Sequence, residues 1–204
     1  MDEIGLFPLG LVLLPAEQVP LHIFEPRYRE LIGESLEQDL PFGIVYADED
    51  GLRPIGTLAT ITEVTERFED GRLNILVEGG ARFRLVELTE GRAFVTGRVE
   101  LVDDQHDPAN PADVERALML FARLAELTSV NVRPPAPETP ALSFAIAGRF
   151  DFSPDLKQEL LAESSERIRL ARLCELLTIA AETVERQIEI AASAQTNGKV
   201  HPPA

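Results

Sequence analysis

Alternating hydrophobic and polar residues in the first half of the chain predict β-strands. In RLNILVE, Leu73, Ile75 and Val77 alternate with polar side chains for most of the stretch, and in ARFRLVE, Phe83 and Leu85 alternate with arginines. Successive side chains of a strand point to opposite faces, so this pattern indicates sheets with one buried and one solvated face. Several such runs between residues 55 and 102 predict a small antiparallel barrel or sandwich.

Two glycine-containing pairs divide these runs. Asp70-Gly71 lies between RFE and RLNILVE and predicts a two-residue hairpin, because glycine readily supplies a positive φ. Gly79-Gly80 separates the next two runs and predicts either a turn or a bulge.

The pattern changes to a helical period after the polar stretch QHDPANPAD at residues 105–113. From Val114 onward, apolar residues recur near every 3.6 positions. Thr139-Pro140 and Ser153-Pro154 each predict a helix start, with the hydroxyl residue as N-cap and proline first in the helix. A broad apolar stripe from Ile168 to Ile188 predicts a long final helix. We predict a β-domain over residues 1–110, a helical bundle over 111–192 and a flexible tail over 193–204.

The stretch VPLHIFEPRYREL, residues 19–31, predicts a strand that turns into a helix. Proline disfavours the helical conformation of the residue before it, here Glu25, and suits the first helical position, here Pro26. The apolar residues that follow share one helical face; they are Tyr28, Leu31, Ile32 and Leu36. The turn explains the polar residues of this stretch without any chemistry.

The charge balance limits the partners that we expect. The net charge is −16, and residues 1–110 alone hold 22 acidic and 9 basic side chains. Nucleic-acid phosphates and anionic membranes attract basic surfaces, so we expect neither as a partner. No apolar run has the length of a membrane span, the N-terminus lacks a cationic signal region, and Cys174 is the single cysteine. These features predict a soluble cytoplasmic protein.

Candidate catalytic and metal-ligating residues are few and scattered. The three histidines lie far apart at His22, His106 and His201, with no HExxH or CxxC spacing for zinc. Cys174 lies among leucines and is predicted to be a small buried side chain. An acid–base pair of His22 and Glu25 is the remaining hydrolase hypothesis, although strand parity favours a packed or capped histidine. We therefore predict no catalytic residue, no metal and no cofactor.

The segment LFPLGLVLLPAEQVPLHIFEPRYRELI resembles the opening of the Lon protease N-terminal domain family, which includes short stand-alone relatives. FGIVYAD, IGTLATITEV, ILVEGGARFRLVEL and DLKQELLAE resemble later motifs of the family in the same order, and the resemblance covers roughly residues 4–190. It implies an α+β fold: a PUA-like six-stranded β pseudobarrel with a packed helix, followed by an α-helical bundle.

The resemblance also implies a function in substrate recognition rather than catalysis. The chain has no GxxxxGK[ST] phosphate loop and no Ser-Lys motif, so we expect neither ATPase nor protease activity, although proteins of this family inherit a protease name. The implied partners are unfolded or extended protein segments, with a separate ATP-dependent protease as a second candidate. The oligomeric state is left open.

Two binding surfaces are therefore expected as alternatives. The leading one is an apolar peptide-binding surface around the strand-to-helix corner, with peptide entry along an edge strand as one mode. Its predicted residues are Leu11, Leu13, His22, Phe24, Glu25, Arg27 and Tyr28. The alternative is RNA binding by the PUA-like barrel, through a local basic patch of Arg82, Arg84, Arg92 and Arg98 if their strands are neighbours.

Overall fold

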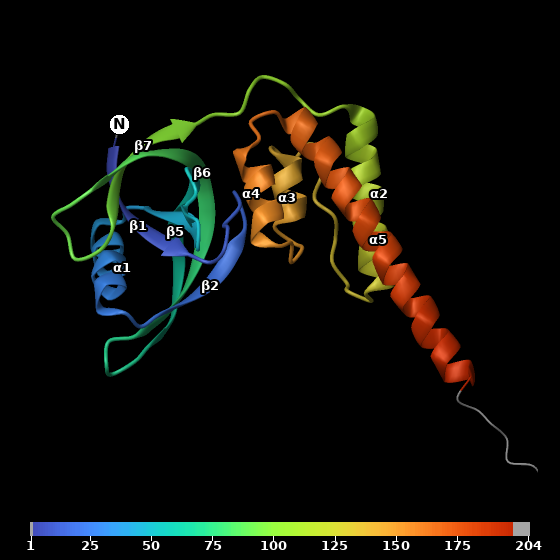
Figure 1. Cartoon of the computed structure of the whole chain (residues 1–204), viewed down its shortest axis with the longest axis horizontal. Helices are drawn as coiled ribbons and strands as arrows, with labels where there is room; N and C mark the ends of the chain where they lie inside the picture. Colours follow the sequence, from blue (N-terminus) through green and yellow to red (C-terminus); the bar gives the residue numbers. More distant parts are fainter. Residues whose placement is uncertain (1, 198–204) are drawn as a thin grey trace, which may run out of the picture.

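The structure is a computed structural model that describes residues 2–197 (Figure 1). A β-rich part comes first and contains β1 (Asp2–Leu9), β2 (Gln18–Ile23), α1 (Pro26–Gln38), β3 (Phe42–Asp48), β4 (Gly51–Leu52), β5 (Ile55–Arg67), β6 (Leu73–Thr89) and β7 (Thr96–Val102). A helical part follows, with α2 (Pro111–Leu127), α3 (Leu142–Ala147), α4 (Pro154–Ala162) and α5 (Glu166–Asn197). The predicted α+β class is confirmed, whereas the division into two domains at residue 110 stays a prediction.

The strands close into a barrel. Neighbouring strands follow the order β1-β7-β6-β5-β3, and a parallel pairing of β1 with β3 completes the ring. The described residues form seven strands rather than the expected six, and the two-residue β4 pairs with the end of β3. Among the described residues, β2 pairs with β6 alone, so β2 is an edge strand. Pro20 lies in the centre of β2.

Strand β6 is longer than the sequence pattern suggested. It runs through Gly79-Gly80 without ending, and its pairing with β5 shifts register between Thr57 and Ala59. The two glycines therefore mark a bulge, and the alternative of a turn is wrong. A Cβ atom on Gly79 would lie 2.1 Å from the carbonyl oxygen of Leu14. Glycine is needed here because two backbone segments approach too closely for a side chain.

The hairpin between β5 and β6 lies where Asp70-Gly71 predicted it, but its loop spans five residues, Phe68–Arg72, instead of two. The amides of Phe68 and Gly71 close the loop by donating to the oxygens of Arg72 and Phe68, each over 3.0 Å. Gly71 has a φ of 84°, which explains the glycine at this position.

Helix α1 packs on the barrel through the face that the sequence predicted. Tyr28, Leu31 and Ile32 are buried in one hydrophobic cluster with residues of the strands, among them Phe7 and Phe42. Figure 1 shows α1 beside β1, on the side of the barrel away from the helical part. Burial of these side chains provides the main free energy that holds α1 in place.

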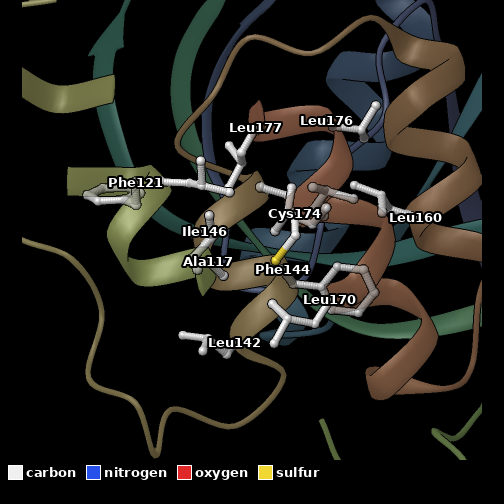
Figure 2. Packing of buried hydrophobic residues seen from close by; sticks show 14 of the residues in the cluster. Ala117, Phe121, Leu142, Phe144, Ile146, Leu160, Leu170, Cys174, Leu176 and Leu177 are labelled. Atoms are coloured by element: carbon white, nitrogen blue, oxygen red, sulfur yellow. The ribbon is translucent and has the colours of Figure 1, made fainter. Parts of the chain in front are cut away.

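The helical part has its own apolar centre. Cys174 of α5 lies among Phe144, Leu160 and Leu170, as Figure 2 shows, and is 1% exposed. This confirms Cys174 as a small buried side chain. The same cluster includes Val12, Leu14 and Ile55 of the β-rich part, so the apolar contacts are continuous between the two parts.

The predicted start of α4 agrees with the structure, and the predicted start of α3 does not. α4 begins at Pro154 directly after Ser153, as predicted, although the Ser153 side chain makes no capping hydrogen bond. α3 begins at Leu142 rather than at Pro140, because Ala141 takes a left-handed conformation with a φ of 46° and starts the helix later. α5 continues to Asn197, so the first residues of the segment 193–204 are helical, and the flexible tail stays a prediction. Residues 198–204 lie outside the described residues.

Two buried arginines join the barrel to the helices. Arg169 of α5 is fully buried, and its guanidinium donates to the Asp104 carboxylate, to Glu166 Oε2, to Ser143 Oγ and to the Glu163 carbonyl. Arg82 of β6 donates to the same Asp104 and to the carbonyls of Leu161 and Glu163. We call Arg82, Asp104, Ser143, Glu166 and Arg169 the arginine junction. Because each buried charge has partners, the junction holds the two parts in one relative position.

Candidate functional site

The turn between β2 and α1 has the geometry that its sequence predicts. Glu25 is extended, with φ −70° and ψ 134°, and Pro26 is the first residue of α1. The amides of Tyr28 and Arg29 both donate to the Glu25 carbonyl, over 3.0 and 2.9 Å, and these bonds close the first helical turn. The predicted strand-to-helix corner is confirmed.

Three aromatic rings gather on the surface at this corner. Phe24 is 58% exposed, and the His22 ring stacks on it with centroids 5.8 Å apart and planes at 22°. Phe68, from the loop between β5 and β6, meets the His22 ring edge-on at 6.0 Å. We call His22, Phe24 and Phe68 the aromatic tip. A large apolar ring left in water without a structural reason indicates an interaction surface when other rings extend it.

Hydrogen bonds fix the histidine of the aromatic tip. Asn74 Nδ2 donates to Glu66 Oε2 over 2.9 Å, which leaves Asn74 Oδ1 as the acceptor for His22 Nδ1 at 2.6 Å. With the amide in this orientation, His22 Nδ1 is the donor of this hydrogen bond. His22 is therefore an exposed side chain whose ring is oriented by the Asn74 amide.

The structure does not bring His22 and Glu25 together as an acid–base pair. The partner of Glu25 is Arg27, whose Nε and Nη2 lie 2.9 and 2.8 Å from Glu25 Oε2. Arg27 also lies over the Tyr28 ring, at 4.5 Å from its centroid. Glu25 thus belongs to a surface ion pair, and His22 is a ring oriented by Asn74. Neither contact activates a nucleophile.

Arginines support the loop that carries Phe68. Arg29 of α1 donates from Nη1 to the Asp70 carbonyl over 2.7 Å and so ties the loop to the helix. Arg72 lies over the Phe68 ring at 4.9 Å and binds the Asp70 carboxylate at 2.7 Å. The pKa of Asp70 is lowered, first by the hydrogen bond from the Arg72 amide and further by the guanidinium. Phe68 of the aromatic tip therefore lies on a loop that is held in place by Arg29 and Arg72.

The predicted site residues divide between surface and core. His22, Phe24 and Arg27 are exposed, while Leu11 and Glu25 are partly exposed. Leu13 and Tyr28 are 1% and 5% exposed, and the Tyr28 ring stacks on Phe7 at 4.0 Å. Burial raises the pKa of the Tyr28 hydroxyl. Leu13 and Tyr28 therefore belong to the core and do not line the surface, which corrects their placement in the predicted site.

Phe68 was missing from the predicted residues. Its signal in the sequence is the apolar residue of ERFEDG, set among charges directly before the Asp-Gly turn. The structure leaves Phe68 half-buried, because the end of a hairpin offers an aromatic ring little core to enter.

The basic patch that motivated RNA binding is not formed. Strands β6 and β7 are neighbours, as the hypothesis required, but Arg82 is 4% exposed and points into the arginine junction. Arg92 and Arg98 are neutralised by ion pairs with Glu34 and Glu87. This leaves Arg84 as the exposed member that forms no ion pair within residues 2–197. A single arginine gives little attraction for a phosphate backbone.

Three further possibilities are a nucleophilic cysteine, a metal site and a membrane span, and the described residues give little support to any of them. Burial raises the pKa of the Cys174 thiol, which makes it a poorer nucleophile. Residues 2–197 contain no group of three or more His, Cys, Asp or Glu side chains placed to hold a metal ion. No helix among them has the length and apolar character needed to cross a membrane.

Comparison with known proteins assigns the family. The model of the ATP-dependent protease La (LON) substrate-binding domain matches residues 3–178. The chain belongs to this family. The match covers a substrate-binding domain and no catalytic domain.

Curated relatives of the chain are much longer proteins. Lon protease of Paraburkholderia phytofirmans is 28% identical over 208 residues, which cover 93% of this chain and 25% of that protein. Lon protease of Parabacteroides distasonis is 31% identical over 136 residues, which cover 62% of this chain and 16% of the relative. The chain thus spans about a quarter or less of the length of these relatives.

Solved structures share the fold. The Lon N-terminal domain protein from Xanthomonas campestris superposes with a TM-score of 0.66 at 24% identity, covering 85% of this chain and 97% of the other. The N-terminal domain of a Mycobacterium avium complex Lon protease gives 0.68 at 19% identity, covering 87% and 98%. The expected Lon N-terminal fold is confirmed.

Proposed function

We propose that this Lon substrate-binding domain protein is a non-catalytic module that binds exposed segments of other proteins at the aromatic tip. The proposal is carried by the exposure of Phe24, at 58%, within a cluster of three rings. The membership of the chain in a substrate-binding family supports the same class of partner.

The chemistry of the aromatic tip suits apolar side chains of unfolded segments. Aromatic rings offer a large contact area with few rotatable bonds, so they lose little conformational entropy on binding. Folded proteins bury most of their large apolar residues, whereas unfolded chains expose them. A surface of this kind therefore selects unfolded or extended segments over folded proteins.

Side chains, rather than an added strand, provide the contact in this proposal. The free edge of β2 carries Pro20, and proline has no amide hydrogen to offer an incoming strand. Entry of a peptide by strand addition is thus disfavoured at the edge next to the aromatic tip.

We further propose that the bound segment is presented to a separate ATP-dependent protease in the cytoplasm. The named relatives are Lon proteases, of which the chain matches a part. A module of this size acts as an adaptor by raising the local concentration of the client near the protease. A chaperone-like holding role without the protease uses the same surface.

Photo-crosslinking tests the proposal directly. Phe24 is replaced by p-benzoylphenylalanine, and the chain is irradiated with carboxymethylated, permanently unfolded α-lactalbumin or with its native, disulfide-intact form. A second chain carries the crosslinker at Ile179, which is 59% exposed on α5. We expect a crosslink from position 24 to the unfolded form alone. Equal yields from positions 24 and 179, or from both client forms, would reject the proposal.

A further inference from the structure

A hollow at the opposite end of α1 from the aromatic tip has the lining of a binding site. Its volume is about 500 Å³, within the range of ligand pockets. Its apolar wall comes from α1, the barrel and the β6–β7 connection, and includes Leu31, Phe42, Leu58 and Phe94. We call this hollow the barrel-end pocket.

The floor of the barrel-end pocket is tightly built. Gly5 of β1 forms part of it, and a Cβ atom there would lie 2.2 Å from Leu31 Cδ1 and 3.0 Å from Phe94 Cε2. Phe94 is 6% exposed and is covered by the Arg92 guanidinium, 4.8 Å from its ring centroid. The hollow is therefore bounded by packed residues and does not depend on a loose loop.

An exposed leucine stands at the mouth of the barrel-end pocket. Leu40 follows the left-handed Asp39 that ends α1, lines the pocket and is 56% exposed. An apolar side chain in this position extends the apolar wall toward solvent. An entering apolar group therefore makes contact before it is fully inside.

The rim of the barrel-end pocket carries one net negative charge. Glu3 and Glu34 both line it. Arg92 also lines the pocket and forms an ion pair with Glu34, so these two charges neutralise each other and the net negative charge of the rim comes from Glu3. Glu3 is exposed, accepts a 3.0 Å hydrogen bond from Thr89 Oγ1, and forms no ion pair within residues 2–197. The pocket also lies in the half of the chain with 22 acidic and 9 basic side chains.

We infer that the barrel-end pocket binds a bulky apolar side chain of a protein segment that carries lysine or arginine beside it. The apolar wall contacts the bulky apolar side chain, and the Glu3 carboxylate faces the lysine or arginine. Charge complementarity selects this segment over an acidic one of equal hydrophobicity. The inference builds on the proposed function, because it names the kind of segment, but it places the contact at a second surface.

Peptides of matched composition test the inference. The probe is a fluorescein-labelled ten-residue peptide of glycine and serine with one central leucine flanked by two lysines. One comparison peptide replaces the leucine by serine, and another replaces both lysines by glutamate. Fluorescence anisotropy with the full chain measures the affinity of each. We expect at least about tenfold weaker binding without the leucine. We expect about two- to fivefold weaker binding for the glutamate peptide, and this difference should shrink in high salt.

Two leucine variants locate the peptide. Leu40→Arg removes apolar contact at the mouth and repels the lysines, so it should weaken the lysine peptide about tenfold. Leu101→Arg is the matched control, because Leu101 is 61% exposed on β7 and does not line the pocket. Thermal unfolding of both variants confirms that they are folded. Equal affinities for Leu40→Arg and Leu101→Arg, or no preference for lysine over glutamate, would overturn the inference.

The outcome is separable from that of the proposed function. Crosslinking from position 24 reports on the aromatic tip, and the Leu40 variant reports on the barrel-end pocket. If position 24 fails to crosslink while Leu40→Arg weakens the lysine peptide, the aromatic tip is rejected and the barrel-end pocket stands. The reverse result rejects the barrel-end pocket alone.

Discussion

Lys157 Nζ lies 2.5 Å from Glu17 Oε1, between α4 and the loop that leads into β2. The two side chains are 12% and 7% exposed. Glu17 uses its other oxygen to accept the Leu14 amide at 2.9 Å. This ion pair lies between the barrel and the helices, as the arginine junction does. The two buried charge clusters together explain why the two parts hold one relative position.

Removal of either partner of this ion pair is expected to destabilise the chain. Glu17→Gln leaves the Lys157 cation buried without its counterion, and Lys157→Met leaves the carboxylate in the same situation. Each should lower the free energy of unfolding by about 3–5 kcal/mol, and the double variant by less than the sum. Urea denaturation measures all three. The exposed pair Arg123–Glu185 is the control, where Arg123→Met should cost less than about 1 kcal/mol.

A conservative change in the arginine junction should also be costly. Arg169→Lys keeps the charge but replaces five fixed donors by three, so Ser143 Oγ and Asp104 lose partners. We expect a loss of about 2–4 kcal/mol in the free energy of unfolding, measured in urea. Arg186→Lys, on an exposed part of α5, should change it by no more than about 0.5 kcal/mol. Similar values for the two variants would show that the junction does not hold the parts together.

Truncation of the aromatic tip should reduce client binding without unfolding the chain. Phe24→Ser removes the ring that stacks on His22, and Phe68→Ser removes the ring that contacts His22 edge-on. We expect about 1–2 kcal/mol weaker binding of unfolded α-lactalbumin for Phe24→Ser, measured by anisotropy. The free energy of unfolding should change by no more than about 0.5 kcal/mol, since Phe24 is exposed. Ile179→Ser is the matched surface control, and an equal loss of binding there would contradict the assignment.

Cys174 should make stability depend on alkaline pH. Burial raises the pKa of its thiol, so the folded chain holds the proton more tightly than the unfolded chain. Its contribution is therefore complete below the unfolded pKa of about 8.5 and is lost as pH rises through the higher folded value. We expect the stability advantage of the wild type over Cys174→Ala to shrink between pH 8 and pH 10 in urea denaturation. A constant difference across this range would show that the thiol does not titrate differently on folding.

The sequence predicted local structure well where a single residue decides the backbone. Pro26 fixes the start of α1, and Gly71 supplies the positive φ of the hairpin. The face of α1 that packs on the barrel followed from the helical period. Placement of Tyr28 in the binding surface failed because the period shows that residues share a face, but it does not show whether a partner covers that face.

The arginines show where sequence patterns stop being informative. Strand parity placed Arg82 with Arg84 on the solvated side, yet Arg82 is buried against a carbonyl 79 residues away in the chain, that of Leu161. Such partners are brought together by the packing of α4 and α5 on the barrel, which no local period encodes. The aromatic tip has the same origin, since Phe68 reaches His22 through the pairing of β2, β6 and β5.

Pro20 has a consequence if the aromatic tip binds unfolded chains as proposed. An unpaired edge strand beside a cluster of aromatic rings could otherwise pair with the bound chains and nucleate their aggregation. A residue that cannot donate a hydrogen interrupts that pairing at the middle of the strand. Under the proposed function, Pro20 would thus allow the chain to bind aggregation-prone segments without nucleating their assembly into fibres.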